Sequence, residues 1–229
     1  SLGAAIHGVF YGQTINTFFP ARAGDVLKIV IFSRSQGSAA TTATGVIISD
    51  KVIDLLALVV LILLSRSFLI GNLNWSIPIS TKGIALAVAT LFLVLFLVRV
   101  ALLKRMKKLE LWWGGFKTGL LGVLEFKKTT LAFFFGIAVW SCEVFTLQCL
   151  CEAQHFPISF SQGVFLLSVL NLAIAIPFSM ANLGPFEAAI VFALGKLGAS
   201  NSMALALAAT YHLLQMAILL GLTGLVALF

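Results

Sequence analysis

The stretch FFPARAGD, residues 18–25, places a proline, an arginine and an aspartate between two apolar segments. The flanking segments, residues 1–17 and 26–34, are both shorter than the roughly 20 residues that a helix needs to span a bilayer core. Proline interrupts helices, and backbone groups freed inside a membrane must face protein or water rather than lipid. In a membrane protein this stretch therefore predicts a broken-helix hairpin that re-enters the bilayer.

The composition indicates that the chain is a membrane protein. Hydrophobic residues make up 60% of the sequence, charged residues make up 10%, and the mean hydropathy is +1.09. An ordinary soluble domain has about a quarter charged residues. Four segments are long enough to cross a bilayer, namely 38–64, 83–103, 129–151 and 203–229. We therefore expect an all-α polytopic membrane protein with a single transmembrane domain over residues 1–229.

The basic residues gather in one connection between spans, residues 104–128. Seven of them lie there: Lys104, Arg105, Lys107, Lys108, Lys117, Lys127 and Lys128. The positive-inside rule makes this loop cytoplasmic, so we expect a multi-pass protein of the cell (inner or plasma) membrane, with no nucleic-acid partner. The stretch LWWGGFKTGLLGVLEF, residues 111–126, interleaves aromatic residues with glycines and suits a segment on anionic headgroups. A charge cluster that only sets topology is the alternative.

A second interrupted region surrounds IPFSMANLGPFE, residues 176–187. The apolar segments on either side, 161–176 and 185–197, are again too short to span a bilayer. Proline and glycine interrupt the hydrophobic run here as they do in the first region. We expect a second re-entrant, broken-helix hairpin.

The two interrupted regions have the same order of features. Asp25 precedes Gly37 by twelve residues, Glu187 precedes Gly198 by eleven, and a long apolar segment follows each glycine. With the basic loop inside, the first unit ends in the cytoplasm and the second ends outside, which predicts an inverted-topology repeat. Chance similarity of two broken helices is the alternative. The predicted division is repeat 1 at about 1–64, linking spans and the basic loop at 65–160, and repeat 2 at about 161–229.

Charged residues lie near the middle of two expected spans. Asp50, Lys51 and Asp54 share one span, and Glu143 lies in another. A charge at a span centre costs about 2.5 to 3.5 kcal/mol on insertion scales, so such residues usually face a cavity and a partner. Asp50 and Asp54 are one helical turn apart and share a face. We expect one polar cavity lined by these residues together with those of the interrupted regions, the alternative being an ion pair that only fixes packing.

Two residues of the interrupted regions each allow two interpretations. Glu187 would be the third residue of a helix that begins at Gly184 and Pro185, where a carboxylate caps backbone N–H groups, and this role is compatible with one in a transport path. Arg22 could hold a phosphate through its planar fork, with help from N–H groups at the start of the following helix. The alternative for Arg22 is snorkelling to the headgroups.

The sequence resembles the family of the lysylphosphatidylglycerol synthase transmembrane region. The run NTFFPARAGDVLKIVIFSRSQGSAATTATGVIISDKVIDLL, residues 16–56, has the family's Asn, its Pro-x-Arg-x-Gly-Asp element, a basic residue before a Gly, and a charged pair in the next span. IPFSMANLGPFEAAIVFALGKLG, residues 176–198, is similar to the second Pro/Gly-rich element that ends in Glu. The chain departs from the family at Asp50-Lys51, usually Glu-Arg, and at Ala181-Asn182, usually Gly-Gly. Further N-terminal helices of the family are expected to be missing before Ser1.

The resemblance implies a flippase-like membrane domain. Two-part enzymes of the family move aminoacylated phosphatidylglycerol after a separate soluble domain has made it, and free-standing relatives are linked to other lipid or polyprenyl-phosphate substrates. Because no synthase domain follows Phe229, we expect no enzyme activity. The predicted function is translocation of an anionic or phosphate-bearing lipid. The alternatives are an ion-coupled transporter of small solutes and a membrane component of lipid-linked glycan synthesis.

The sequence contains no evident catalytic or metal-binding constellation. His7, His155 and His212 are scattered, and the three cysteines are expected to be free thiols with no metal-ligand spacing around them. No cofactor is expected, the expected partners are membrane lipids with anionic headgroups, and a homo-oligomer is compatible with the sequence. The residues expected to line the path are Asn16, Arg22, Asp25, Arg34, Asp50, Lys51, Asp54, Glu143, Asn182 and Glu187.

Overall fold

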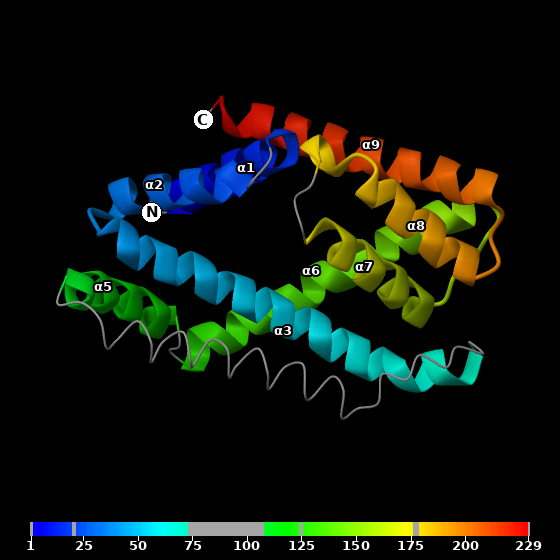
Figure 1. The fold of residues 1–229 in the computed structure, drawn as a ribbon, viewed down its shortest axis with the longest axis horizontal. Helices are drawn as coiled ribbons and strands as arrows, with labels where there is room; N and C mark the ends of the chain where they lie inside the picture. Colours follow the sequence, from blue (N-terminus) through cyan, green and yellow to red (C-terminus); the bar gives the residue numbers. More distant parts are fainter. Residues whose placement is uncertain (1, 20–21, 73–107, 124–125, 176–178, 229) are drawn as a thin grey trace.

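The computed structural model describes residues 2–19, 22–72, 108–123, 126–175 and 179–228. Over these ranges the chain is helical and forms no strand, which confirms the predicted all-α class. The elements, shown in Figure 1, are α1 (Leu2–Phe18), α2 (Ala23–Gln36), α3 (Ala40–Asn72), α5 (Lys108–Val123), α6 (Phe126–Ala153), α7 (Phe160–Ile174), the 3-10 helix η2 (Met180–Asn182), α8 (Pro185–Lys196) and α9 (Asn201–Val226).

Among the described residues, two helices are long and apolar enough to cross a membrane. They are α6, over Lys127–Ala153, and α9, over Asn201–Val226. Helix α3 has 33 residues and is the longest described helix, but Asp50, Lys51 and Asp54 interrupt its apolar run. The expected span 83–103 lies outside the described residues. The multi-pass topology therefore stays a prediction.

Both interrupted regions form helical hairpins. Helices α1 and α2 have 17 and 14 residues, and α7 and α8 have 15 and 12, so the breaks fall where proline and glycine predicted them. Local signals set the other ends of these helices. Gly37 closes α2 in a left-handed conformation with φ 59°, and Ser159 begins α7 with a capping box that includes Gln162.

The two hairpins run in opposite directions along the molecule. In Figure 1, α3 and α9 follow their hairpins and point opposite ways along the long axis. The packing is reciprocal, because α1 packs on α9 while α3 packs on α7. A hydrogen bond of 2.7 Å joins the hydroxyls of Thr14 on α1 and Thr223 on α9. This arrangement is the one that an inverted repeat would produce.

The tips of the two hairpins meet near the middle of the molecule. Helix α1 packs against η2, and Nη2 of Arg22 donates a hydrogen bond of 3.3 Å to the carbonyl oxygen of Ala175, just after α7. The residues that turn the chain at each tip therefore lie next to one another, although they are about 150 positions apart in the sequence.

The apolar core lies on the side of the second hairpin. Side chains of α6, α7, α8 and α9 that are less than 1% exposed form its centre, namely Val144, Leu147, Leu166, Ile190, Leu194 and Leu207. In α2 the buried residues are instead Gly24 and Lys28. The first hairpin is therefore held mainly by close backbone contact and polar groups.

Helix α5 occupies most of the loop that was expected to rest on lipid headgroups. Its glycines press against the start of α3, since a Cβ at Gly119 would lie 2.1 Å from the carbonyl oxygen of Thr42, and one at Gly45 would lie 2.4 Å from that of Phe116. One face of α5 is thus covered by α3, while Trp112 remains 46% exposed. Contact of that outer face with lipid stays a prediction.

Candidate functional site

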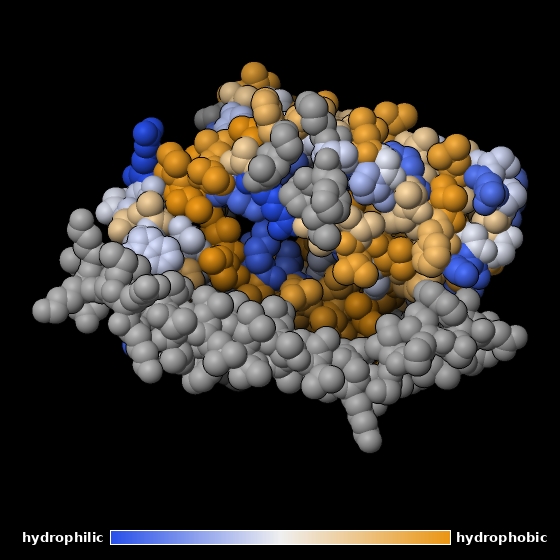
Figure 2. Space-filling model, viewed as in Figure 1, coloured by the Kyte–Doolittle hydropathy of each residue, from blue (hydrophilic) through white to orange (hydrophobic). Residues whose placement is uncertain are grey.

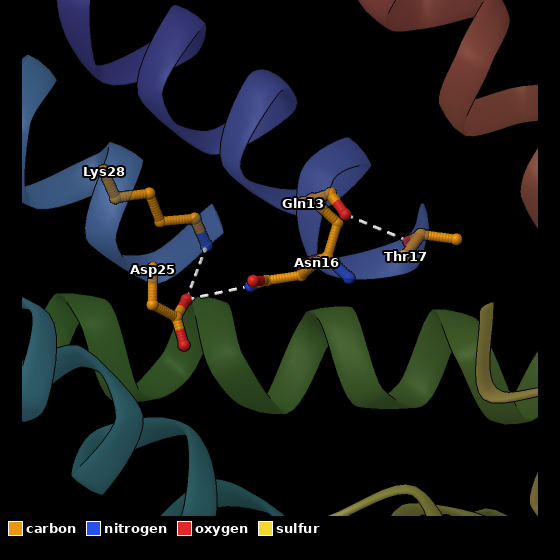
Figure 3. A network of polar contacts seen from close by, with 5 residues as sticks. All are labelled: Gln13, Asn16, Thr17, Asp25 and Lys28. Carbon is orange, nitrogen blue, oxygen red and sulfur yellow. Dashed lines mark hydrogen bonds and ion pairs between the residues drawn. The ribbon is translucent and has the colours of Figure 1, made fainter. Parts of the chain in front are cut away.

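A first polar group lies inside the α1–α2 hairpin. Nδ2 of Asn16 donates a hydrogen bond of 3.0 Å to Oδ1 of Asp25, and Nζ of Lys28 lies 3.8 Å from the same oxygen (Figure 3). Lys28 is only 8% exposed, although it is a charged residue. The sequence predicted Asn16 and Asp25 as site residues but not Lys28, which lies one turn after Asp25 on α2.

Two glycines allow this group to form. A Cβ at Gly24 would lie 1.8 Å from the carbonyl oxygen of Gly12, so α1 and α2 approach more closely than any larger residue permits. The Lys28 side chain lies over Gly12, where a Cβ would come within 2.5 Å of its Cγ and Cε. Gly24 of the ARAGD element therefore lets Asn16 approach Asp25, and Gly12 leaves room for the stem of Lys28.

Charges of α3 extend this first polar group. Lys28 interacts electrostatically with Asp25, Asp50, Lys51 and Asp54. The group holds three carboxylates and two amines, so its net charge is −1 when all five are ionised. Asp50 and Lys51 are exposed and Asp54 is half-buried. The structure thus brings the predicted charges of α3 toward the first hairpin.

A second polar group surrounds two adjacent residues of α9. The hydroxyl of Tyr211 donates a hydrogen bond of 2.5 Å to Oε2 of Glu143 on α6, and Nε2 of Gln215 lies 3.5 Å from the same oxygen. Nδ1 of His212 lies 2.6 Å from Oε1 of Glu187 on α8. Tyr211 and His212 therefore connect α9 to carboxylates on two different helices.

Glu187 caps its own helix, as one of the two interpretations of the sequence predicted, and it also contacts a third helix, whereas its role in a transport path stays a prediction. Its Oε2 accepts a hydrogen bond of 2.7 Å from the backbone N–H of Gly184 and so caps α8. Its Oε1 pairs with His212, whose ring is 6% exposed and stacks on Phe186 at a centroid distance of 4.0 Å. The local cap and the tertiary contact occur in the same side chain.

A cavity of about 350 Å³ lies beside the second polar group. Helices α1, α6 and α9 and the tip of the second hairpin contribute to its walls. Its polar lining residues are Gln13, Thr17, Glu143, Thr146, Asn182, Tyr211, His212 and Gln215. The described residues that line it include no lysine and no arginine.

The cavity takes in two of the residues that were expected to share a single polar cavity, and that expectation stays a prediction. Glu143 and Asn182 line the cavity, but Arg22, Asp25 and the charged residues of α3 do not. The end of α1 lies between the two groups and serves both, because Asn16 points to Asp25 while Gln13 and Thr17 line the cavity (Figure 3). Figure 2 also shows hydrophilic residues in a hollow between the α1–α2 hairpin and α3.

The two predicted arginines are far apart. Arg22 is exposed at the hairpin tip. Arg34 is exposed in the last turn of α2, twelve residues and about 18 Å further along the helix. Arg34 therefore does not join the meeting point of the tips.

Strained backbone marks both hairpin tips. Arg22, Ala181 and Asn182 each have φ 54° although none of them is glycine. Such conformations cost about 1 to 3 kcal/mol each and cluster at functional sites, where the surrounding structure enforces them. Their presence at both tips supports a functional role for the region where the tips meet.

Several site residues were missed by the sequence analysis. Tyr211, His212 and Gln215 are polar positions in the apolar helix α9, and their spacing places them on adjoining faces. That spacing was an available signal, and His212 is both buried and hydrogen-bonded. The described residues contain no group of three or more potential metal ligands. Cys142 and Cys149 are free and exposed, and Cys151 is free and buried.

Comparison with known proteins places the chain in a membrane protein family. The family model described as "Lysylphosphatidylglycerol synthase TM region" matches residues 1–222. The chain is 26% identical over 208 residues to the UPF0104 membrane protein MJ1078 of Methanocaldococcus jannaschii, an alignment that covers 88% of this chain and 87% of that protein. No solved structure matches the chain significantly. The chain is therefore a membrane protein that belongs to the family of the lysylphosphatidylglycerol synthase TM region.

Proposed function

We propose that this protein is a lipid translocase of the cell membrane. It moves an anionic or phosphate-bearing lipid, such as an aminoacyl-phosphatidylglycerol or a polyprenyl-phosphate-linked lipid, between the leaflets, and it catalyses no reaction on that lipid. The two hairpins enter the bilayer from opposite sides as re-entrant elements of an inverted repeat. Membership of the family and the antiparallel arrangement of the hairpins support this proposal.

The meeting of the two hairpin tips carries the proposal. Arg22 uses Nη2 to hold the carbonyl oxygen of Ala175, and its guanidinium is otherwise exposed. A guanidinium has five N–H donors in a planar fork, so the remaining donors match a phosphate. The N–H groups in the first turn of α2 begin directly after Arg22 and favour an anion there.

The outer surface fits a path that is open to lipid. Large apolar side chains on α6 are exposed, and Phe134, Phe135 and Phe145 are 62%, 64% and 66% exposed. The polar contacts of Asn16 with Asp25 and of Tyr211 with Glu143 lie between helices instead. A lipid could therefore keep its tails against the apolar exterior while its headgroup passes the tips, which lowers the cost of taking a charged headgroup through hydrocarbon.

The charges of the first polar group balance the phosphate site. Asp25, Asp50 and Asp54 together outnumber Lys28 and Lys51, so this group repels an anion rather than binds it. A lipid phosphate would therefore bind to Arg22 at the tips rather than among these carboxylates. In this proposal Arg22 contacts the lipid phosphate, and the carboxylates balance the positive charge of the arginine.

One observation favours a second function. The cavity beside Tyr211 and His212 has a volume of about 350 Å³ and a polar lining, which suits a small soluble solute as well as part of a headgroup. An ion-coupled transporter of small solutes would use this cavity and its carboxylates. It would not require Arg22.

Lipid exchange in proteoliposomes tests the proposal. A fluorescent phosphatidylglycerol is placed in both leaflets, and a membrane-impermeant reductant bleaches the outer one, so that translocation shows as continued loss of signal. We expect Arg22→Ala to slow exchange about tenfold, because a lost charge-assisted hydrogen bond costs at least about 1.5 kcal/mol. Arg22→Lys keeps the charge without the fork and should retain part of the rate. Asp50→Asn should also slow exchange, because the amide keeps the size of the carboxylate but cannot ionise.

The control is Lys117→Ala, which removes an exposed basic residue from α5 and should leave exchange unchanged. The folded fraction of each variant is measured by size-exclusion chromatography and thermal unfolding. If folded Arg22→Ala and Asp50→Asn proteins exchange lipid at the wild-type rate, the lipid path is wrong. The solute transporter then becomes the leading function.

A further inference from the structure

The cavity beside Tyr211 presents hydrogen-bond acceptors to a ligand. The hydroxyl of Thr17 donates to the backbone carbonyl oxygen of Gln13 at 3.0 Å (Figure 3). The hydroxyl of Thr146 donates to the backbone carbonyl oxygen of Cys142 at 2.9 Å. A hydroxyl has one proton, so one that gives it to its own helix keeps only lone pairs for a ligand. Both threonines line the cavity and therefore offer it acceptor oxygens.

Glu143 and Gln215 add two more acceptors to this wall. The Tyr211 hydroxyl and the Gln215 amide nitrogen both approach Oε2 of Glu143, and among the described residues none hydrogen-bonds to Oε1. Since Gln215 turns its amide nitrogen to Glu143, its carbonyl oxygen remains as an acceptor. Both side chains line the cavity. Together with the threonines they suit a ligand that donates several hydrogen bonds.

The charge of the cavity favours a cation. Among the described residues that line it, Glu143 is the only carboxylate, and none is a lysine or an arginine. His212 also lines the cavity, but its ring is paired with Glu187, which balances a proton on the ring. A primary ammonium combines a positive charge with three N–H donors. The rings of Phe186 and Tyr211 line the same cavity, and aromatic rings also attract ammonium groups.

The size of the cavity favours an organic cation over a metal ion. Its volume of about 350 Å³ compares with about 30 Å³ for one water molecule. Calcium requires six to eight oxygen ligands at about 2.3 to 2.6 Å, and the described residues contain no group of three potential metal ligands. The cavity therefore has room for an ammonium group together with the carbon atoms that carry it.

One wall of the cavity is an apolar stripe of α9. Leu214, Ile218 and Leu222 line the cavity at intervals of four residues, so they share a face of the helix. They are 38%, 52% and 41% exposed, and the cavity thus borders the apolar outer surface. A ligand can keep an alkyl chain on this stripe while its polar end reaches Glu143. This combination is typical of an amphiphile.

We propose that this cavity binds the primary ammonium group of an amphiphile. Glu143 is the anionic partner, and Thr17, Thr146 and Gln215 accept the remaining N–H groups. The nonpolar part of the amphiphile lies along the stripe of α9.

The ammonium site adjoins the proposed phosphate contact. Ile174 lines the cavity, and the next residue, Ala175, accepts the hydrogen bond from Arg22. A lipid headgroup with a phosphate and an amine carries the two charges that Arg22 and Glu143 attract. That the ammonium belongs to a translocated lipid rests on the proposed function, whereas binding of the ammonium does not.

Native mass spectrometry measures binding of a lipid amine. The purified protein is mixed with equal amounts of dioleoylphosphatidylethanolamine and dioleoylphosphatidylcholine. The two lipids share their phosphate and chains, but the methyl groups of the second remove every N–H donor from its nitrogen. We expect the wild-type protein to retain the ethanolamine lipid about tenfold over the choline lipid. Glu143→Gln should abolish this preference.

Saturation-transfer NMR measures binding of a soluble amine. The protein is placed in phosphatidylcholine nanodiscs, and n-butylammonium is compared with n-butyltrimethylammonium and n-butanol. We expect the strongest transfer to n-butylammonium, and Glu143→Gln should reduce it to the level of the other two. A response to the ethanolamine lipid alone identifies the ligand as a lipid, and a response to n-butylammonium alone identifies it as a free amine. Either response supports the site.

Two further variants make the test specific. Glu152→Gln is the matched control, because it makes the same change on the same helix at an exposed position that does not line the cavity. It should keep the wild-type preference. Thr146→Val removes an acceptor oxygen with little change of shape and should reduce the preference about threefold. Size-exclusion chromatography and thermal unfolding measure the folded fraction of each variant.

Three outcomes would overturn the proposal. They are no preference for either primary amine in the wild-type protein, equal binding of the methylated and primary amines, and a preference that survives in folded Glu143→Gln. If Glu143→Gln does not fold, an unchanged preference in Thr146→Val counts against the site. Because binding is measured at equilibrium, ammonium binding without lipid exchange contradicts the proposed function and supports the site. Exchange of phosphatidylglycerol without binding of either amine supports the function and overturns the site.

Discussion

The carboxylate of each hairpin finds its polar partners in a different part of the molecule. In the first, Asp25 finds both of its close partners, Asn16 and Lys28, inside its own hairpin. In the second, Glu187 caps its own helix but also reaches His212 on α9. The first carboxylate is therefore fixed by local packing of two helices. The second also depends on how a third helix is placed.

The packing of the two hairpins also differs in how much it depends on other helices. The α1–α2 contact is made by Gly12 and Gly24 at backbone distance, whereas α7 and α8 are embedded in the main apolar core. A glycine contact tolerates no added atom, but it also buries little apolar surface. A core contact contributes more burial and allows more adjustment. The first hairpin should therefore break by steric change, and the second by loss of a tertiary contact.

The largest expected effect comes from Gly24→Ala. The new Cβ would lie 1.8 Å from a backbone oxygen of α1, which cannot move aside without separating the helices. We expect a loss of more than about 3 kcal/mol, measured as thermal unfolding in detergent by tryptophan fluorescence. Gly195→Ala in α8 is the matched control, because nothing lies within 4 Å of its Cβ, and it should be neutral or stabilise by about 0.5 to 1 kcal/mol. Equal effects of the two changes would refute the comparison.

The next effect comes from removing each carboxylate. Glu187→Ala loses the cap and leaves the buried His212 without its partner, so we expect a cost of about 2 to 3 kcal/mol. Asp25→Ala should cost less, about 1 kcal/mol, because Asp50 and Asp54 remain within electrostatic reach of Lys28. Unfolding midpoints of both variants check this order. An Asp25 variant less stable than the Glu187 variant would show that the first hairpin also relies on its carboxylate.

A smaller effect is expected for Tyr211→Phe. The change removes only the hydroxyl that donates to Glu143 and keeps the ring in the core. We expect a loss of about 1 kcal/mol, with Gln215 as the remaining donor to Glu143. A double-mutant cycle with Glu143→Gln measures the coupling between the two residues. No coupling would mean that this bond does not tie α6 to α9.

The smallest effect on stability is expected for cysteines at positions 36 and 199. These two variants also give the most direct test of topology. Gln36 is the exposed last residue of α2, and Ala199 follows α8 and is partly buried, so we expect both substitutions to change stability by less than about 1 kcal/mol. If the hairpins enter from opposite sides, an impermeant maleimide should label one position from outside and the other only from inside. Labelling of both from the same side would refute the inverted repeat. Gln36→Cys and Ala199→Cys are compared in a cysteine-free background.

The sequence by itself determined where the helices break and how they end. Pro20, Gly37, Gly184 and Pro185 act on their own segments of backbone, and the cap by Glu187 is formed within four residues, so these features are local and could be predicted. The order of Asp25–Gly37 and Glu187–Gly198 likewise predicted two similar units before any packing was known. The family resemblance rests on the same local motifs, so it agreed with these positions.

Only the tertiary structure decided which polar residues share a site. The meeting of Glu187 with His212 requires that α9 pack on α8, and the burial of Lys28 requires that Gly12 and Gly24 bring α1 onto α2. The end of α1 contacts both polar groups, because Asn16 bonds to Asp25 while Gln13 and Thr17 line the cavity beside Tyr211. Side chains far apart in sequence become partners only through the positions of whole helices, which depend on packing that no single segment specifies.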